Sequence, residues 1–126
     1  MPDADPFPRV KRAIIRVLLG ALSPHGFVQH NKTVYFYRDR DDLRDIFFIQ
    51  KMRSDAITLT YGVMRRPDDW EPGIPNANAR RLNEGDFYCC KYVDHVERSI
   101  ARLVTDFESE AIPYFSQFQS PDDLPA

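Results

Sequence analysis

Apolar and polar residues alternate through the middle of the chain, which is the pattern of a β-strand with one buried face. The alternation is clearest over residues 57–65, where the large apolar side chains fall on one face: Ile57, Leu59, Tyr61 and Val63. Residues 45–52 carry apolar side chains on both faces, which is typical of a central strand covered on each side. With the polar turn at residues 53–55 between them, the two segments predict a β-hairpin at the centre of the fold.

Shorter strand patterns flank this hairpin. Residues 27–30 and 33–38 predict either one strand bent at Asn31 and Lys32 or two short strands with a turn there. Residues 87–92 predict a short strand that returns to the sheet. We therefore expect an antiparallel sheet of about four strands.

Apolar residues recur at helical spacing near both ends of the chain. The first periodic stretch contains Val10, Ile14, Val17, Leu18 and Ala21, with Ile15, Leu19 and Leu22 widening its apolar face. The second stretch contains Val93, Val96, Ile100, Leu103, Val104 and Phe107. The first helix should end at residues 23–26, which include a proline and a glycine, and Pro113 should end or kink the second.

These elements predict a single α+β domain over residues 1–126. Its antiparallel sheet of about four strands would pack one face against the N-terminal helix and the long C-terminal helix. A chain of 126 residues with 43% hydrophobic content is large enough to bury a core without disulfides or metals. Residues 1–6 are expected to be a frayed N-terminus, and residues 65–86 a long irregular loop.

The formal net charge of −2 argues against non-specific binding to nucleic acid, which requires a clear basic excess. One basic stripe remains, because Arg9, Lys11, Arg12 and Arg16 follow the polar side of the first helix. The stripe could contact nucleic acid or an acidic partner. We favour a solvated helix face, because charged residues normally lie opposite the apolar stripe of a helix.

The adjacent cysteines Cys89 and Cys90 would point to opposite faces of a strand, and a disulfide between neighbours is strained. Two reduced thiols, one buried and one half-exposed, fit the reducing cytoplasm, and we expect that location. The acidic, proline-containing start of the chain does not have the pattern of a signal peptide. No apolar run approaches the roughly 18–20 residues that span a bilayer, so we expect no membrane contact.

The sequence predicts no catalytic residues, no bound metal and no cofactor. The histidines His25, His30 and His95 lack the paired spacing of a zinc site. A cysteine–histidine pair would need a third, orienting group, and the spacing identifies none. The carboxylate pairs are neighbours in sequence, which is typical of turns and helix starts rather than of carboxylates facing each other across a cleft.

The irregular segment 65–86 holds the candidate binding residues: Arg65, Arg66, Trp70, Arg80 and Arg81. Arginine and tryptophan are enriched in protein-interface hot spots, and both also stack on nucleic acid. Exposed Tyr35 and Tyr37 would extend this contact surface. Alternatively, Trp70 folds back onto the sheet, the arginines pair with nearby acids, and the two tyrosines form a second packed sheet face.

The order of several short motifs resembles a known family. Leu22–Phe27 follows the first helix with a Gly-Phe pair, Tyr35–Arg38 is an aromatic–Arg strand, and Ile46–Gln50 lies in the next strand. A strand ending in Gly62–Val63 and a late Ile112–Pro113 complete the pattern. Over roughly residues 8–120, this arrangement resembles the small bacterial proteins grouped as domain of unknown function 4304. The chain departs from that pattern in its proline-rich insert after Val63. The resemblance implies no activity, but some members of that family look like immunity proteins of bacterial toxin systems.

We therefore expect a non-enzymatic protein-binding module whose partner is another protein, with a toxin-immunity role as one form of it. A homodimer is an open alternative. A second hypothesis is an enzyme or small-ligand binder with a pocket between the sheet and the 65–86 loop. Binding of nucleic acid through the arginine pairs is the weakest of the three hypotheses.

Overall fold

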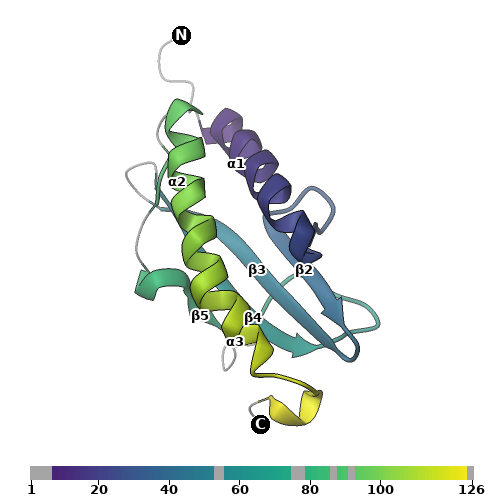
Figure 1. The fold of residues 1–126 in the computed structure, drawn as a ribbon. Helices are drawn as coiled ribbons and strands as arrows, with labels where there is room; N and C mark the ends of the chain where they lie inside the picture. Colours follow the sequence, from purple (N-terminus) through teal and green to yellow (C-terminus); the bar gives the residue numbers. More distant parts are fainter. Residues whose placement is uncertain (1–6, 53–55, 75–78, 86–87, 91–92, 125–126) are drawn as a thin grey trace.

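The structure is a computed structural model that describes residues 7–52, 56–74, 79–85, 88–90 and 93–124. Two long helices lie side by side over one face of an antiparallel sheet (Figure 1). The predicted α+β class is thereby confirmed, with the N-terminal and C-terminal helices on the same face. No helix in these described ranges is both long and apolar enough to cross a membrane.

The first helix, α1 (Phe7–Leu22), leads into a 3-10 turn, Ser23–His25. Gly26 follows with a φ of 93°, in the left-handed region that favours glycine, so the stop predicted here is confirmed. The second helix, α2 (Val93–Asp106), continues through a π-helical turn, Phe107–Ala111, into α3 (Ile112–Ser116).

Pro113 does not end this helix, so that part of the prediction is wrong. It lies inside a continuous helix, where its missing N–H removes a hydrogen bond and its ring would clash with the preceding turn. The turn just before it is π-helical, and the Ile112 N–H donates to the carbonyl oxygen of Phe107. The wider turn accommodates the proline, and the helix continues to Ser116.

Within the described ranges, the sheet has six strands: β1 (Val28–Gln29), β2 (Tyr35–Arg40), β3 (Leu43–Met52), β4 (Ala56–Arg65), β5 (Arg80–Arg81) and β6 (Tyr88–Cys89). Their order is β1-β2-β3-β4-β5, with β6 also pairing with β4, and every pairing is antiparallel. The β3–β4 hairpin is confirmed as the centre of the sheet. Its turn at residues 53–55 lies outside the described residues.

β1 and β6 lie in segments predicted as strands, whereas β5 was missed because its two residues are too few to show an alternation. Of the two possibilities at Asn31 and Lys32, the structure has two strands, β1 and β2, with a turn between them. Within the predicted irregular segment 65–86, β5 and a short turn, Leu82–Gly85, return the chain to the sheet.

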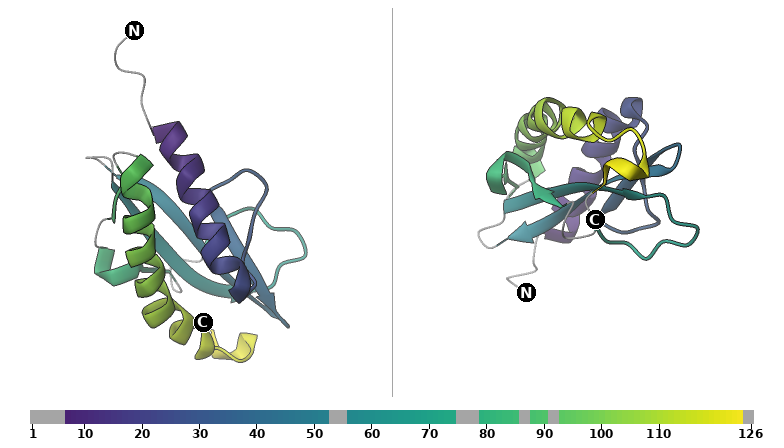
Figure 2. Two further views of the ribbon diagram at one scale, coloured as in Figure 1. Left: turned by 45° about the horizontal axis from the view of Figure 1, so that its top comes forward. Right: turned by 90° about the horizontal axis from the view of Figure 1, so that it is seen from below.

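Both helices cover the same face of the sheet, called the inner face below, as Figure 2 shows. The inner face packs against the helices, and Phe36, Phe47 and Tyr61 lie side by side on it in register. Phe47 contacts Phe27 and Phe107, whose ring centroids lie 5.2 and 5.0 Å away. On the outer face, Thr58 and Thr60 of β4 are buried as well, so the prediction that this strand has only one buried face is wrong.

Candidate functional site

The predicted site residues fall into separate groups. Trp70, Tyr35 and Tyr37 come together on the outer face of the sheet, as the ring contacts below show. Arg65 and Arg66 are exposed at the end of β4. Arg80 and Arg81 form β5, on the far side of β4 from β2 and β3. These groups are nonetheless adjacent on the outer face, because the Phe48 ring lies 4.9 Å from that of Tyr35 and Phe48 lines a hollow with Arg80 and Arg81.

The first group is an aromatic cluster made of His30, Tyr35, Tyr37, Arg44 and Trp70. The Trp70 ring lies edge-on to its neighbours, with centroids 4.9 Å from His30, 5.5 Å from Tyr37 and 6.1 Å from Tyr35. The Arg44 guanidinium lies 4.3 Å from the Tyr37 ring centroid and 5.1 Å from that of Trp70. All five side chains are half-buried, so the cluster presents part of each to solvent.

Ion pairs hold Arg44 in place within the aromatic cluster. Its Nε and Nη2 donate to the two carboxylate oxygens of Asp39 at 2.7 and 3.0 Å. Arg66 Nε lies 3.6 Å from the same carboxylate, so Asp39 connects the start of the loop to the cluster. The indole N–H of Trp70 is buried and has no hydrogen-bond partner among the described residues. Ring packing therefore fixes Trp70, which folds back onto the sheet, as one of the two alternatives had it.

The second group lies beside β5, on the helix side of the sheet. A hollow of about 460 Å³ is lined by Tyr61, Arg80, Arg81, Glu84 and Glu110. The Arg80 guanidinium stands 4.5 Å from the Tyr114 ring centroid, and Arg81 is exposed. This hollow contains opposite charges in equal number and two potential acid–base groups, Tyr61 and Glu110.

The polar groups of this hollow already bind one another. The Tyr61 hydroxyl donates to Glu110 Oε2 at 2.6 Å, and the backbone N–H of Asn83 donates to Glu110 Oε1 at 2.9 Å. Asn83 and Glu84 have φ angles of 51° and 57°, in the left-handed region that non-glycine residues rarely adopt. Glu110 thus anchors a left-handed turn to both the sheet and the π-helical turn, which is a structural role.

Burial and the hydrogen bond to Glu110 raise the pKa of Tyr61 well above its usual value, and burial with the hydrogen bond to Asp106 does the same for Tyr88. The folded chain therefore keeps both phenol protons at pH values where the unfolded chain loses them. We expect the free energy of unfolding to fall as the pH rises above about 10, by at most roughly 1.4 kcal/mol per pH unit for each tyrosine.

Urea unfolding between about pH 8 and 11 measures this dependence. Tyr61→Phe should flatten the slope, and adding Tyr88→Phe should flatten it further. Burial also raises the pKa of Cys90 to about 11, so some slope persists in the double variant. An unchanged slope in Tyr61→Phe would contradict the assignment.

The pocket expected between β4 and the 65–86 segment has a counterpart in the structure. A hollow of about 280 Å³ lies on the outer face, lined by Phe48, Gln50, Thr60, Ile74, Ala79, Arg80 and Arg81. Its lining combines an aromatic ring, an amide, a hydroxyl and two guanidinium groups. Such a set could take a small anion with a flat apolar part.

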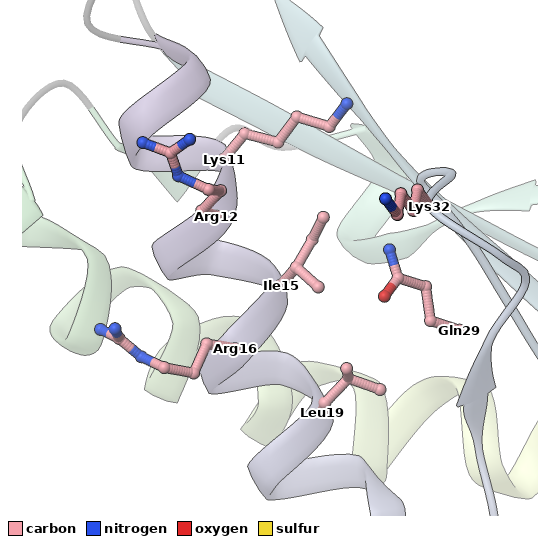
Figure 3. A pocket seen from close by; sticks show the side chains of 7 residues that line it. All are labelled: Lys11, Arg12, Ile15, Arg16, Leu19, Gln29 and Lys32. Carbon is pink, nitrogen blue, oxygen red and sulfur yellow. The ribbon is translucent and has the colours of Figure 1, made fainter.

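The largest of these hollows is a groove along α1, and Lys11, Arg12 and Arg16 of the basic stripe noted in the sequence line it. It has a volume of about 610 Å³ and is lined by Lys11, Arg12, Ile15, Arg16, Leu19, Gln29 and Lys32 (Figure 3). Ile15 and Leu19 widen the apolar face of α1 beyond what its neighbours cover, and both remain half-exposed. The apolar stripe of α1 is wider than its contact with the core requires, and this width is the signal in the sequence that indicates the groove.

The histidines and cysteines form no metal site in the part of the chain that the structure describes, but Cys89 and His95 line one hollow of about 390 Å³ with Arg98, Ser99 and Arg102. No group of three or more His, Cys, Asp or Glu side chains is placed there to hold a metal ion. His25 pairs with Glu108 at 2.8 Å, and His30 belongs to the aromatic cluster. Cys89 is exposed and Cys90 buried, and both are free thiols, which fits the predicted orientation of the pair.

Comparison of the chain with known proteins does not assign a function to these surfaces. No family model matches the chain, and comparison with curated proteins and with solved structures finds no similar protein. The resemblance to domain of unknown function 4304 therefore stays a prediction.

Proposed function

We propose that this chain is a non-enzymatic protein-binding module and that the aromatic cluster is its contact surface. The supporting observation is the packing of Trp70 with Tyr35, Tyr37 and Arg44 into one half-exposed cluster. Tryptophan, tyrosine and arginine are the side chains most enriched in interface hot spots. Rings already held by their neighbours lose little side-chain entropy on binding, which favours affinity.

The exposed arginines at the end of β4 extend this surface. Arg65 and Arg66 are both exposed next to the loop that carries Trp70. Their charge favours a partner with acidic groups around a central apolar or aromatic contact. The resemblance to a family with immunity-like members makes a cytoplasmic bacterial toxin the first partner to test, with a second copy of this chain as the alternative.

The test starts from capture of the partner by the wild-type chain at low salt, followed by calorimetry with the purified partner. Trp70→Ala should weaken binding by about 2 kcal/mol or more, roughly 30-fold, because it removes the centre of the cluster. Trp70→Phe keeps a ring in the same place and should bind nearly as well. Failure to capture a partner, or equal affinity of Trp70→Ala for it, would contradict the proposal.

A small-ligand site is the second candidate function, favoured by the hollow beside β5 on the outer face. Its ligand would be an anion with a flat apolar part, held between Phe48 and the guanidinium groups of Arg80 and Arg81. The two functions use different residues. Loss of ligand binding in Arg81→Ala, with Trp70→Ala unaffected, would favour this second candidate.

A further inference from the structure

We propose that the α1 groove is a docking site for an acidic amphipathic helix of a protein partner. The groove lies on the helix-covered side of the molecule, whereas the aromatic cluster lies on the outer face of the sheet. The inference therefore goes beyond the function proposed above, and either surface can fail without the other.

The floor of the groove is apolar. Ile15 and Leu19 are four residues apart on α1 and lie one above the other on the same face. The aliphatic stems of the flanking lysine and arginine side chains extend this apolar lining. Spacing of this kind matches the leucine-type side chains that an amphipathic helix presents one turn apart.

The charged residues described at the rim of the groove are all positive. Arg12 and Arg16 lie on one side of Ile15 and Leu19, whereas Lys11 extends toward Lys32 and Gln29 on the other side (Figure 3). Among the residues that the structure describes, no acidic side chain lines the groove and no salt bridge involves any of its four cations. These four cations therefore surround an apolar floor without an acidic partner among the described residues, although the net charge of the chain is −2. Charge complementarity favours an acidic occupant.

The dimensions favour a helix. From Lys11 to Leu19 the groove follows α1 for about 12 Å, which is the length of roughly two helical turns. Single-stranded nucleic acid is typically bound on aromatic rings on which its bases stack, and the described residues that line the groove include none. A membrane-binding surface presents its apolar residues on an exposed helix face rather than on the floor of a groove.

The probe is a labelled synthetic helix of about four turns, with leucines one turn apart on one face and glutamates beside them. We expect fluorescence anisotropy with the full chain to show binding that weakens as salt increases. Arg12→Glu with Lys32→Glu should weaken binding by roughly tenfold or more, because attraction becomes repulsion on both sides of the floor. The same probe with serines for leucines, or lysines for glutamates, should not bind.

The matched control is Arg98→Glu with Arg65→Glu, which changes the net charge equally at exposed positions outside the groove. This control and Trp70→Ala should both bind the probe like the wild type. The inference is overturned if the wild type does not bind the probe at low salt, or if the control loses as much affinity as the groove variant. Displacement of the probe by anionic vesicles or single-stranded DNA, bound more tightly than the probe, would also overturn it.

Discussion

Replacement of Asp45 with alanine is expected to lower the free energy of unfolding by about 3–5 kcal/mol. Asp45 is fully buried on the inner face of β3. Its carboxylate accepts hydrogen bonds from Arg38 Nε at 2.7 Å and from Arg40 Nε and Nη2 at 2.6 and 2.8 Å. Removing the carboxylate leaves two largely buried guanidinium groups without a counter-charge, which costs far more than the loss of a surface ion pair.

The same two arginines hold the ends of both helical regions, which adds to the expected effect. Arg38 Nη1 donates to the carbonyl oxygen of His25, just after α1, at 3.0 Å. Arg40 donates to the carbonyl oxygens of Phe115 and Phe118 at 3.0 and 2.9 Å, at the end of α3. Asp45 therefore orients two side chains that close helix ends, where free carbonyls need donors.

Urea unfolding of Asp45→Ala beside Asp39→Ala gives the comparison. Asp39 pairs with Arg44, but its side chain is 25% exposed whereas that of Asp45 is fully buried, so its loss should cost less, roughly 1 kcal/mol. Asp45→Asn, which keeps an acceptor but no charge, should fall between the two. Similar losses in Asp45→Ala and Asp39→Ala would show that the buried cluster contributes no more than a surface pair.

Phe47→Ala is expected to cost about 3–5 kcal/mol, because it opens a cavity in the centre of the core. Phe47 is fully buried and stacks on Phe36 with a centroid distance of 4.7 Å. Its ring also contacts Phe27 and Phe107, from the segment after α1 and from the π-helical turn. The cavity would thus remove contacts from the sheet and both helical regions at once.

The next residue provides the matched control. Phe48 points to the outer face, is only half-buried, and has one ring neighbour among the described residues, Tyr35, at 4.9 Å. Phe48→Ala should cost about 1–2 kcal/mol, because much of its ring is already in contact with water. Thermal unfolding of the two variants would therefore separate them clearly, and equal costs would contradict the assignment of inner and outer faces.

The sequence predicts the long elements well, because their periodicity runs over many residues. The alternation of β4 correctly places Leu59 and Tyr61 on the inner face and Thr58 and Thr60 on the other. It places Phe47 and Phe48 on opposite faces for the same reason.

The buried Asp45 cluster could not be predicted from the same pattern. A charged residue in a strand is normally assigned to solvent. Its burial depends on Arg38 lying opposite it in the β2–β3 register, which is set by where the turn begins. The apolar residues of this strand begin only at Ile46, so the sequence indicates neither the β2–β3 register nor the pairing of Arg38 with Asp45.

The candidate site was the least predictable part. The composition of the loop correctly drew attention to Trp70, but the path of the loop decides which residues Trp70 meets. His30 and Arg44 join it from distant positions in the chain. In the groove, Ile15 and Leu19 have the same helical spacing as core residues, and only the positions of the neighbouring elements leave them uncovered.

The π-helical turn at Phe107–Ala111 also determines the phase of everything that follows it. Each residue of an α-helix advances by about 100°, so a strict α-helix would rotate side chains four residues apart steadily around its axis. The wider turn offsets this drift, and Phe107, Ala111 and Phe115 all stay in the core. The carbonyl groups that accept from Arg40 lie beyond this turn. One local change in helical winding thus determines the orientation of α3 and of the residues that follow it.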